Sequence, residues 1–172
     1  MSSQINTTSE ANQTVKAFIS LGSNLPSDFG SPEVTLRLAI ERISALSVGE
    51  VSISSVYTTE PVDCPGDTPF FLNAAMAVVR LSSRSAQDFL LELLAIEAEF
   101  GRERREQKNQ PRCLDLDLIT YGNQQVEDEL LILPHPRAHQ RQFVLQPIAE
   151  IEPDLVLPGQ TRTVTELLAS LS

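Results

Sequence analysis

Residues Gly101–Ile119 (GRERREQKNQPRCLDLDLI) join a basic segment to a short strand pattern that carries two aspartates. Asp115 and Asp117 are two residues apart, and side chains at that spacing point to the same face of a strand. The leucines that alternate with them are therefore expected to point into a core. Two carboxylates side by side repel each other unless a positive group lies between them. The stretch predicts a strand with one face directed at a divalent metal or at basic side chains.

The basic half of this stretch supplies the complementary charge. Mg²⁺ prefers carboxylate and phosphate oxygens, and guanidinium groups pair with phosphates. Carboxylates beside arginines are typical of sites that catalyse phosphoryl transfer. Taken singly, a bare D-x-D more often only solubilises a strand face, and a basic loop is more often solvated charge. The cationic residues of the segment are Arg102, Arg104, Arg105, Lys108 and Arg112.

The distribution of charge supports an anion site. The chain has 13 Lys and Arg against 23 Asp and Glu, a formal net charge of −10. This balance argues against a general nucleic-acid binder, which needs a basic footprint. Seven of the 13 cationic residues nevertheless lie between Arg102 and Arg141. An acidic protein that concentrates its positive charge in one region is expected to bind an anion there.

The length of 172 residues predicts one domain. Residues 1–14 are polar, lack the features of a secretory or mitochondrial signal, and are expected to form a disordered tail before a single domain over 15–172. No stretch is apolar for long enough to cross a membrane. Cys64 and Cys113 form no metal-binding pattern. We expect free thiols in a reducing compartment, the cytoplasm, and a monomer.

Hydrophobic periodicity predicts alternating strands and helices. The expected order is strand, helix, strand, strand, helix, strand, followed by a C-terminal extension with two short helices. This β-α-β-β-α-β order indicates an α+β, ferredoxin-like fold, an antiparallel sheet with helices on one face. The strands are expected at 15–21, 51–57, 70–81 and 113–121, and the helices at 32–49, 85–100, 139–150 and 163–171.

Two further segments carry candidate binding residues. Leu133–Arg137 (LPHPR) holds His135 between prolines, where it can donate to a phosphate or transfer a proton. The long irregular loop from Thr58 leads through two phenylalanines to Asn73. An aromatic ring beside an amide suits a flat heterocycle, although ordinary core aromatics are equally consistent. No P-loop and no kinase glycine-rich loop is present in the sequence, so a bound ATP would be held by another device.

Together these motifs resemble the 6-hydroxymethyl-7,8-dihydropterin pyrophosphokinase family. The match is collinear from about Ile19 to Pro158, and the segment around the aspartates is its most specific part. The matching segments are ISLGSNL (19–25), VYTTEPV (56–62), FLNAA (71–75), IEAEFGRER (96–104), PRCLDLDLI (111–119), LPHPR (133–137), RQFVLQP (141–147) and EIEPDL (150–155).

The resemblance implies an activity and a set of roles. Members transfer the pyrophosphoryl group of ATP to the hydroxymethyl oxygen of the pterin and release AMP, in folate biosynthesis. Asp115 and Asp117 match the pair that holds two Mg²⁺ ions. The catalytic positions are Arg102, Arg104 and Arg112; the ATP-binding positions are these with Arg105, His135, Arg141 and, in support, Glu97; and the pterin-binding positions are Thr59, Val62, Phe71, Asn73 and Phe143.

Two other readings differ in class. A Mg²⁺-dependent nucleotidyltransferase of the polymerase-β kind also combines Gly-Ser with D-x-D, but about a dozen residues apart. Here Gly22-Ser23 and Asp115 are over ninety residues apart. A ferredoxin-like binding module without catalysis would not need arginines that converge on two aspartates. The identity of the nucleotide produced from ATP distinguishes these three possible functions.

Overall fold

The computed structural model describes residues 12–61, 64, 66–101 and 113–172. Predictions that concern residues 1–11 of the tail or the basic segment 102–112 therefore lie outside the described residues. The last residue of the predicted tail, Thr14, belongs instead to the first strand. The elements are β1 (Thr14–Ser23), α1 (Pro32–Ser44), β2 (Ser52–Ile53), β3 (Tyr57–Thr59), β4 (Phe71–Leu81), α2 (Ala86–Glu99), β5 (Asp115–Tyr121), β6 (Val126–Glu127), β7 (Ile132–Leu133), the 3₁₀ turn η1 (Ala138–Gln140), α3 (Gln142–Ile151) and α4 (Val164–Ser170).

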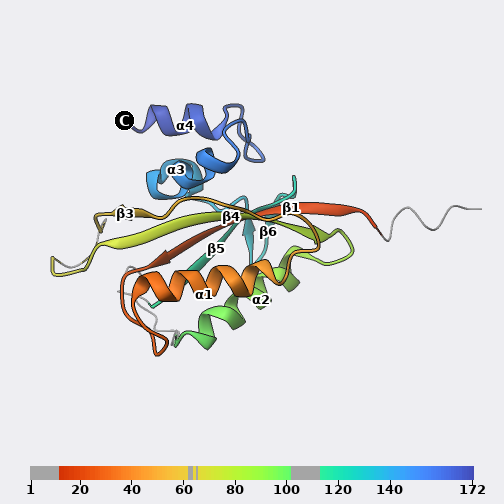
Figure 1. Cartoon of the computed structure of the whole chain (residues 1–172). Helices are drawn as coiled ribbons and strands as arrows, with labels where there is room; N and C mark the ends of the chain where they lie inside the picture. The colour runs from red at the N-terminus through yellow and green to blue at the C-terminus, as the bar shows by residue number, and fades with distance from the viewer. Residues whose placement is uncertain (1–11, 62–63, 65, 102–112) are drawn as a thin grey trace, which may run out of the picture.

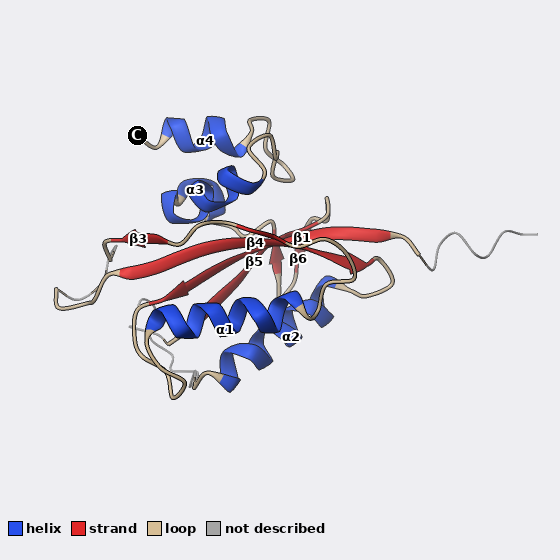
Figure 2. Ribbon diagram, viewed as in Figure 1, coloured by secondary structure: helices blue, strands red, loops and turns tan. Residues whose placement is uncertain are grey.

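The main sheet is antiparallel, with the order β2-β4-β1-β5 and with β3 also paired to β4. Helices α1 and α2 lie on one face of the sheet (Figure 1). This arrangement confirms the predicted α+β, ferredoxin-like layout. The C-terminal extension forms a third layer, because α3 and α4 cover the opposite face of the sheet (Figure 2).

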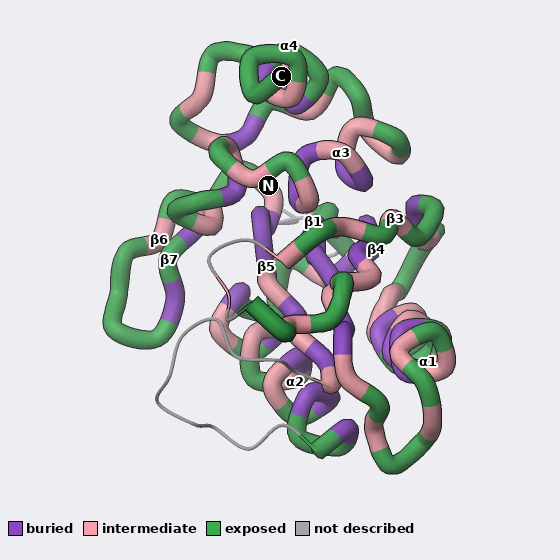
Figure 3. Tube along the Cα trace, turned by 90° about the vertical axis from the view of Figure 1, so that its left-hand side faces the viewer, coloured by how far each residue is buried: buried purple, intermediate pink, exposed green. Residues whose placement is uncertain are grey.

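Each face of the sheet has its own core. The core under α1 and α2 contains Leu21, Met76 and Leu116, and the core under α3 and α4 contains Phe18 and Ile119. Figure 3 shows the buried segments concentrated in the central strands and on the inner sides of the helices. Burial on both faces explains why consecutive residues in the middle of β1 and β4 are buried, rather than alternate ones.

The helix starts follow the sequence signals. Ser31 caps α1 with its side chain, and Pro32 occupies the first helical position. Ser85 and Asp88 form a capping box at the start of α2. Thr163 and Glu166 form another at α4. These side chains satisfy backbone N–H groups that have no partner inside the helix.

Two strand predictions are wrong in detail. The single strand expected at 51–57 is two short strands, β2 and β3, because Ser54 interrupts the ladder. Its hydroxyl accepts the N–H of Ala75 at 2.9 Å, so a side chain replaces a backbone acceptor. The burial is also the opposite of what alternating hydrophobicity favours, since Ser54 is buried and Ile53 is exposed. Strand β1 continues through Gly22 to Ser23, where a loop was expected.

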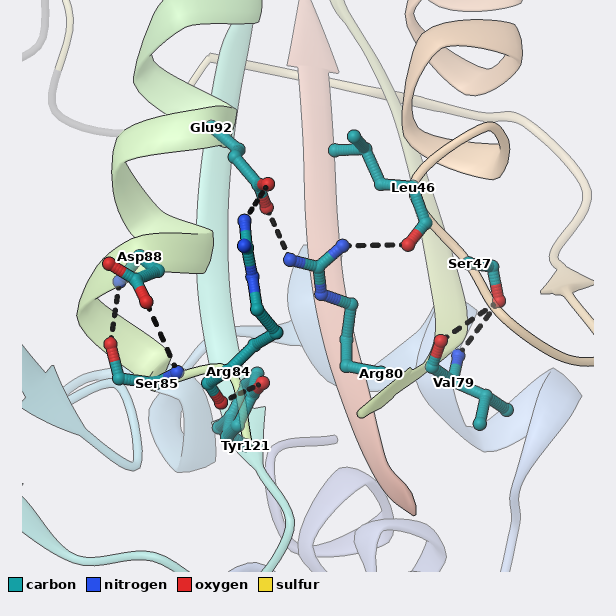
Figure 4. A network of polar contacts seen from close by, with 9 residues as sticks. All are labelled: Leu46, Ser47, Val79, Arg80, Arg84, Ser85, Asp88, Glu92 and Tyr121. Atoms are coloured by element: carbon teal, nitrogen blue, oxygen red, sulfur yellow. Dashed lines mark hydrogen bonds and ion pairs between the residues drawn. The ribbon is translucent and has the colours of Figure 1, made fainter. Parts of the chain in front are cut away.

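A buried arginine fastens the end of β4 to α2 (Figure 4). The Arg80 guanidinium donates to the Leu46 carbonyl at 2.6 Å and to the Glu92 carboxylate at 2.5 Å. It also lies 4.6 Å from the centroid of the Phe89 ring. Arg84 donates to the other oxygen of Glu92 at 3.1 Å. This network contains none of the predicted site residues.

Candidate active site

The predicted site residues of three neighbouring strands fall in one row across the sheet. Asn73 on β4 pairs with Gly22 on β1, and Gly22 pairs with Asp115 on β5. One step along, Ser20 on β1 pairs with both Ala75 and Asp117. Strand alternation places all of these side chains on the α3 side of the sheet. The row brings the predicted pterin amide and the predicted metal ligands onto one surface.

Gly22 forms the floor between the two halves of the row. Neighbouring strands lie about 4.8 Å apart, so Asn73 and Asp115 are separated by about 10 Å across β1. A Cβ at Gly22 would lie 3.4 Å from the Asn73 side-chain oxygen. The missing side chain therefore leaves open surface between Asn73 and Asp115. The ISLGSNL segment contained this residue, but only the strand register shows its position.

The amide of Asn73 is held in a fixed orientation. Its side chain is 4% exposed, and Nδ2 donates to the hydroxyl of Thr59 at 2.6 Å. Thr59 lies on β3, where it pairs with Phe71 of β4. Three of the predicted pterin-binding residues are thus neighbours on two adjacent strands. Val62 lies outside the described residues.

The two aspartates occupy the face that their spacing predicted. Both are half-buried, and Leu114, Leu116 and Leu118 are buried in the core on the other face. Below them, Glu97 of α2 is 1% exposed and accepts the N–H of Leu116 at 2.7 Å. Leu116 is the residue between the aspartates. Glu97 therefore supports the backbone of the aspartate pair from the core side.

His135 lies beside Asp117, with 4.0 Å between its Nε2 and the Asp117 Oδ2. Its Nδ1 accepts the backbone N–H of Arg137 at 3.2 Å, which places the hydrogen of the neutral ring on Nε2. Burial, together with the charges of Arg141 and Arg137, lowers the pKa of His135 from 6.5 to about 4, although the charge of Asp115 raises it. The ring is therefore a neutral donor facing the aspartates at physiological pH.

Arg141 and Phe143 form the start of α3. The Arg141 guanidinium lies 5.4 Å from the centroid of the Phe143 ring, within the range of a cation–π contact. Phe143 is half-buried and packs against the core under α3 and α4. A predicted phosphate contact and a predicted pterin ring are thus adjacent at one helix start.

A pocket of about 320 Å³ opens beside the aspartate strand. Its apolar walls come from α2 and from the β6–β7 hairpin, whose strand β7 contacts β5. This volume is in the range of small-molecule sites. No local sequence pattern indicates this pocket, because its walls come from two elements far apart in the chain. The lining includes Leu90, Leu94, Asp117, Leu131, Ile132 and His135.

The carboxylates of Asp115 and Asp117 suit a metal ion that binds together with a phosphate ligand. Among the described residues, no group of three or more His, Cys, Asp and Glu is placed to hold a metal ion. Mg²⁺ is commonly held by one or two carboxylates together with substrate phosphates and water. Asp115 and Asp117 provide two hard oxygen ligands on one half-buried surface, and this pair fits Mg²⁺ bound to a phosphate chain.

The basic residues Arg102, Arg104, Arg105 and Arg112 lie outside the described residues, so their predicted roles stay predictions. Within the part of the chain that the structure describes, no helix is long and apolar enough to span a bilayer.

Comparisons with known proteins identify the family of this chain. The sequence model of the 7,8-dihydro-6-hydroxymethylpterin-pyrophosphokinase family matches residues 18–153. The 2-amino-4-hydroxy-6-hydroxymethyldihydropteridine pyrophosphokinase of Methylorubrum extorquens is 42% identical over 160 residues, which cover 91% of this chain and 93% of that protein. The Haemophilus influenzae protein of the same name is 39% identical over 155 residues, which cover 90% and 91%.

A solved structure supports the fold. The HPPK-DHPS triple mutant of Plasmodium falciparum with SDX-DHP superposes with a TM-score of 0.68 at 14% identity. The match covers 94% of this chain and 45% of that one, so this chain spans under half of its length. On the strength of the family match and the two relatives aligned over nearly their whole length, the chain belongs to the 7,8-dihydro-6-hydroxymethylpterin-pyrophosphokinase family.

Proposed function

We propose that the row of groups on β4, β1 and β5 is where this pyrophosphokinase transfers the pyrophosphoryl group of ATP to the hydroxymethyl oxygen of 6-hydroxymethyl-7,8-dihydropterin. One observation carries the proposal. Asn73 and Asp115 are in register on either side of Gly22, which has no side chain. A heterocycle held at Asn73 and a phosphate chain held at Asp115 can therefore meet over β1.

The pterin binds at the Asn73 end of the row. The contact with Thr59 fixes the amide of Asn73 and leaves its oxygen toward Gly22, where it can accept from an N–H on the edge of the pterin. Phe71 and Phe143 supply rings for the two faces of the heterocycle. Val62 is added to this pocket from the sequence resemblance alone.

ATP binds at the aspartate end. Asp115 and Asp117 would hold two Mg²⁺ ions, the Nε2–H of His135 would donate to a phosphate oxygen, and Arg141 would add positive charge. The pocket between α2 and the β6–β7 hairpin begins at Asp117, so it is placed to take the adenine. The sequence adds Arg102, Arg104, Arg105 and Arg112 as further phosphate contacts.

In this arrangement the protein acts by position and charge. The pterin alcohol oxygen forms a bond to the β-phosphorus of ATP as the bond from that phosphorus to the α,β-bridging oxygen breaks. AMP leaves with the bridging oxygen, and the alcohol proton is released. Mg²⁺, when bound, neutralises phosphate charge and lowers the pKa of the alcohol. The residues around it orient the reactants and exclude water.

The product nucleotide tests the proposal. Incubation of the protein with ATP, Mg²⁺ and the hydroxymethyl-dihydropterin is expected to yield one AMP per pterin diphosphate, and chelation of Mg²⁺ by EDTA is expected to abolish both products. Release of free pyrophosphate would indicate nucleotidyl transfer instead, and no turnover of any kind would favour a binding module.

Replacing Gly22 with alanine would add one methyl group at the position between the two proposed substrates. Gly22→Ala is expected to fold normally, because the added Cβ meets its nearest neighbour at an ordinary contact distance of 3.4 Å. The methyl group protrudes into the space between the reactants, so we expect kcat/KM to fall by about 10-fold to 100-fold. Steady-state kinetics and thermal melting measure the two effects. An unchanged kcat/KM in a folded Gly22→Ala protein would place the substrates elsewhere.

A cytoplasmic monomer that binds no nucleic acid is part of the proposal. The net charge of −10 and the two free cysteines support it. Light scattering is expected to give the monomer mass of 19.0 kDa.

A further inference from the structure

The Glu150 carboxylate on α3 accepts several hydrogen bonds from Ser55, which lies between β2 and β3, and from Tyr57 at the start of β3. Glu150 accepts the backbone N–H of Ser55 at 3.0 and 3.1 Å with its two oxygens, and the Ser55 hydroxyl at 2.8 Å. It also accepts the hydroxyl of Tyr57 at 2.5 Å. These partners are 93 and 95 residues away in the sequence. The contacts therefore join two distant parts of the chain.

The two parts carry opposite walls of the pterin site. Glu150 and Phe143 are seven residues apart on α3, close to two helical turns, so their side chains lie on the same side of the helix. Tyr57 pairs with Asn73, and two residues later Thr59 pairs with Phe71. The Glu150 contacts thus link the helix that holds Phe143 to the strands that hold Asn73 and Phe71.

The strand at the end of this link has few other attachments. β3 contains three residues and pairs only with β4 among the described strands. It is joined to β2 through the irregular residues at Ser54. A three-residue edge strand gains little stability from its own ladder. The Glu150 carboxylate supplies a second attachment, from the helix α3 that covers this face of the sheet.

The charge state of the link agrees with its geometry. Hydrogen bonds from Tyr57 and Ser55 hold the pKa of Glu150 below its usual value. The bond to Glu150 raises the pKa of Tyr57. Both shifts correspond to a neutral phenol that donates to an ionised carboxylate at physiological pH.

We propose that Glu150, through Ser55 and Tyr57, is a positioning residue that sets the separation between the Phe143 ring and the Asn73 wall, and so the affinity for the pterin. The inference rests on the proposed function, because it assigns these walls to the pterin. Stacking on an aromatic ring depends on separation, and small misplacements are costly in rate. The aspartates of the ATP half lie on β5, at the other end of the row, and Arg141 lies at the opposite end of α3 from Glu150.

Three variants test the link, with a control on the same helix end. Glu150→Ala and Tyr57→Phe each remove part of it, and the double variant removes it from both sides. We expect the pterin KM to rise about fivefold to twentyfold in Glu150→Ala, with the ATP KM changed by less than about twofold. Because both residues belong to one link, the double variant is expected to resemble Glu150→Ala rather than the sum of the two effects. Glu152→Gln, which alters an exposed pair with Lys16, is expected to change neither KM.

Calorimetry of pterin binding, with a non-hydrolysable ATP analogue and Mg²⁺ present, tests the proposed function and the positioning role of Glu150 separately. A wild-type protein that binds no pterin would contradict the proposed function. A wild-type protein that binds pterin while Glu150→Ala binds it equally well would overturn the positioning role alone. A parallel loss of ATP affinity and melting temperature in Glu150→Ala would also overturn it, since that result marks a purely structural contact.

Discussion

Asp117→Ala is expected to lower kcat by about 10²-fold to 10³-fold and to leave the fold intact. The large effect follows from charge, because the variant loses one of the two carboxylates proposed to hold Mg²⁺ on the phosphates. The intact fold follows from position, because the Asp117 side chain is 31% exposed and lies on the face away from the buried leucines of β5. Steady-state kinetics at saturating ATP and pterin measure the first effect, and thermal melting measures the second.

Glu41→Ala is a suitable control for this variant. Glu41 is an exposed carboxylate on α1 that pairs with Arg37, so its removal changes the net charge by the same amount at a site remote from the aspartates. The control is expected to keep full activity and a melting temperature within about 2 °C of the wild type. An Asp117→Ala protein with the kcat of this control would remove the metal role from Asp117.

Arg80→Ala is expected to produce the opposite pattern, a loss of stability with catalysis retained. The variant leaves the Glu92 carboxylate, 27% exposed, without its partner at 2.5 Å, and leaves the Leu46 carbonyl without its donor. Breaking such a half-buried pair is expected to reduce the free energy of unfolding by about 2–4 kcal/mol. For a chain of this size the melting temperature should fall by roughly 5–15 °C.

The kinetic half of this prediction rests on distance. Arg80 and Asn73 are seven residues apart on β4, which corresponds to about 23 Å along an extended strand. Assays well below the melting temperature should therefore give a kcat within about twofold of the wild type. Arg37→Ala, which breaks an exposed helix pair, is the matched control and should cost less than about 0.5 kcal/mol. If Arg80→Ala melted like this control, the buried network would not stabilise the fold.

The two variants together divide the sheet into functional and structural ends. The ends of β4 and β1 near Asn73 and Gly22 carry the small and polar groups that we propose face the substrates. The other end of β4 carries Arg80, which ties the sheet to α2.

The aspartate strand could be predicted from the sequence because its information is local. Alternation of Asp115, Leu116 and Asp117 fixes which side chains share a face, whatever the partner strands are. Helix starts such as Ser31-Pro32 are local in the same sense. The resemblance to the pyrophosphokinases then supplied roles for individual residues, and the comparisons confirm the family.

The rest of the site depends on register and packing between distant segments. That Gly22 lies between Asn73 and Asp115 follows from two strand pairings and a bulge near Phe18, which no local pattern encodes. The attachment of Glu150 to Tyr57 bridges 93 residues. Ser54 shows a further limit, because it is buried while its apolar neighbour Ile53 is exposed, the opposite of what alternating hydrophobicity favours.

The fate of the β-phosphorus of ATP tests most directly whether the row from Asn73 to Asp115 joins the two substrates. The enzyme is incubated with Mg²⁺, the hydroxymethyl-dihydropterin and ATP radiolabelled on that phosphorus, and the products are separated. If the row from Asn73 to Asp115 joins the two substrates as proposed, the label will be recovered in the pterin diphosphate and the AMP will be unlabelled, while Asp117→Ala will form little of either product. Label recovered in free pyrophosphate or in ADP would contradict the account.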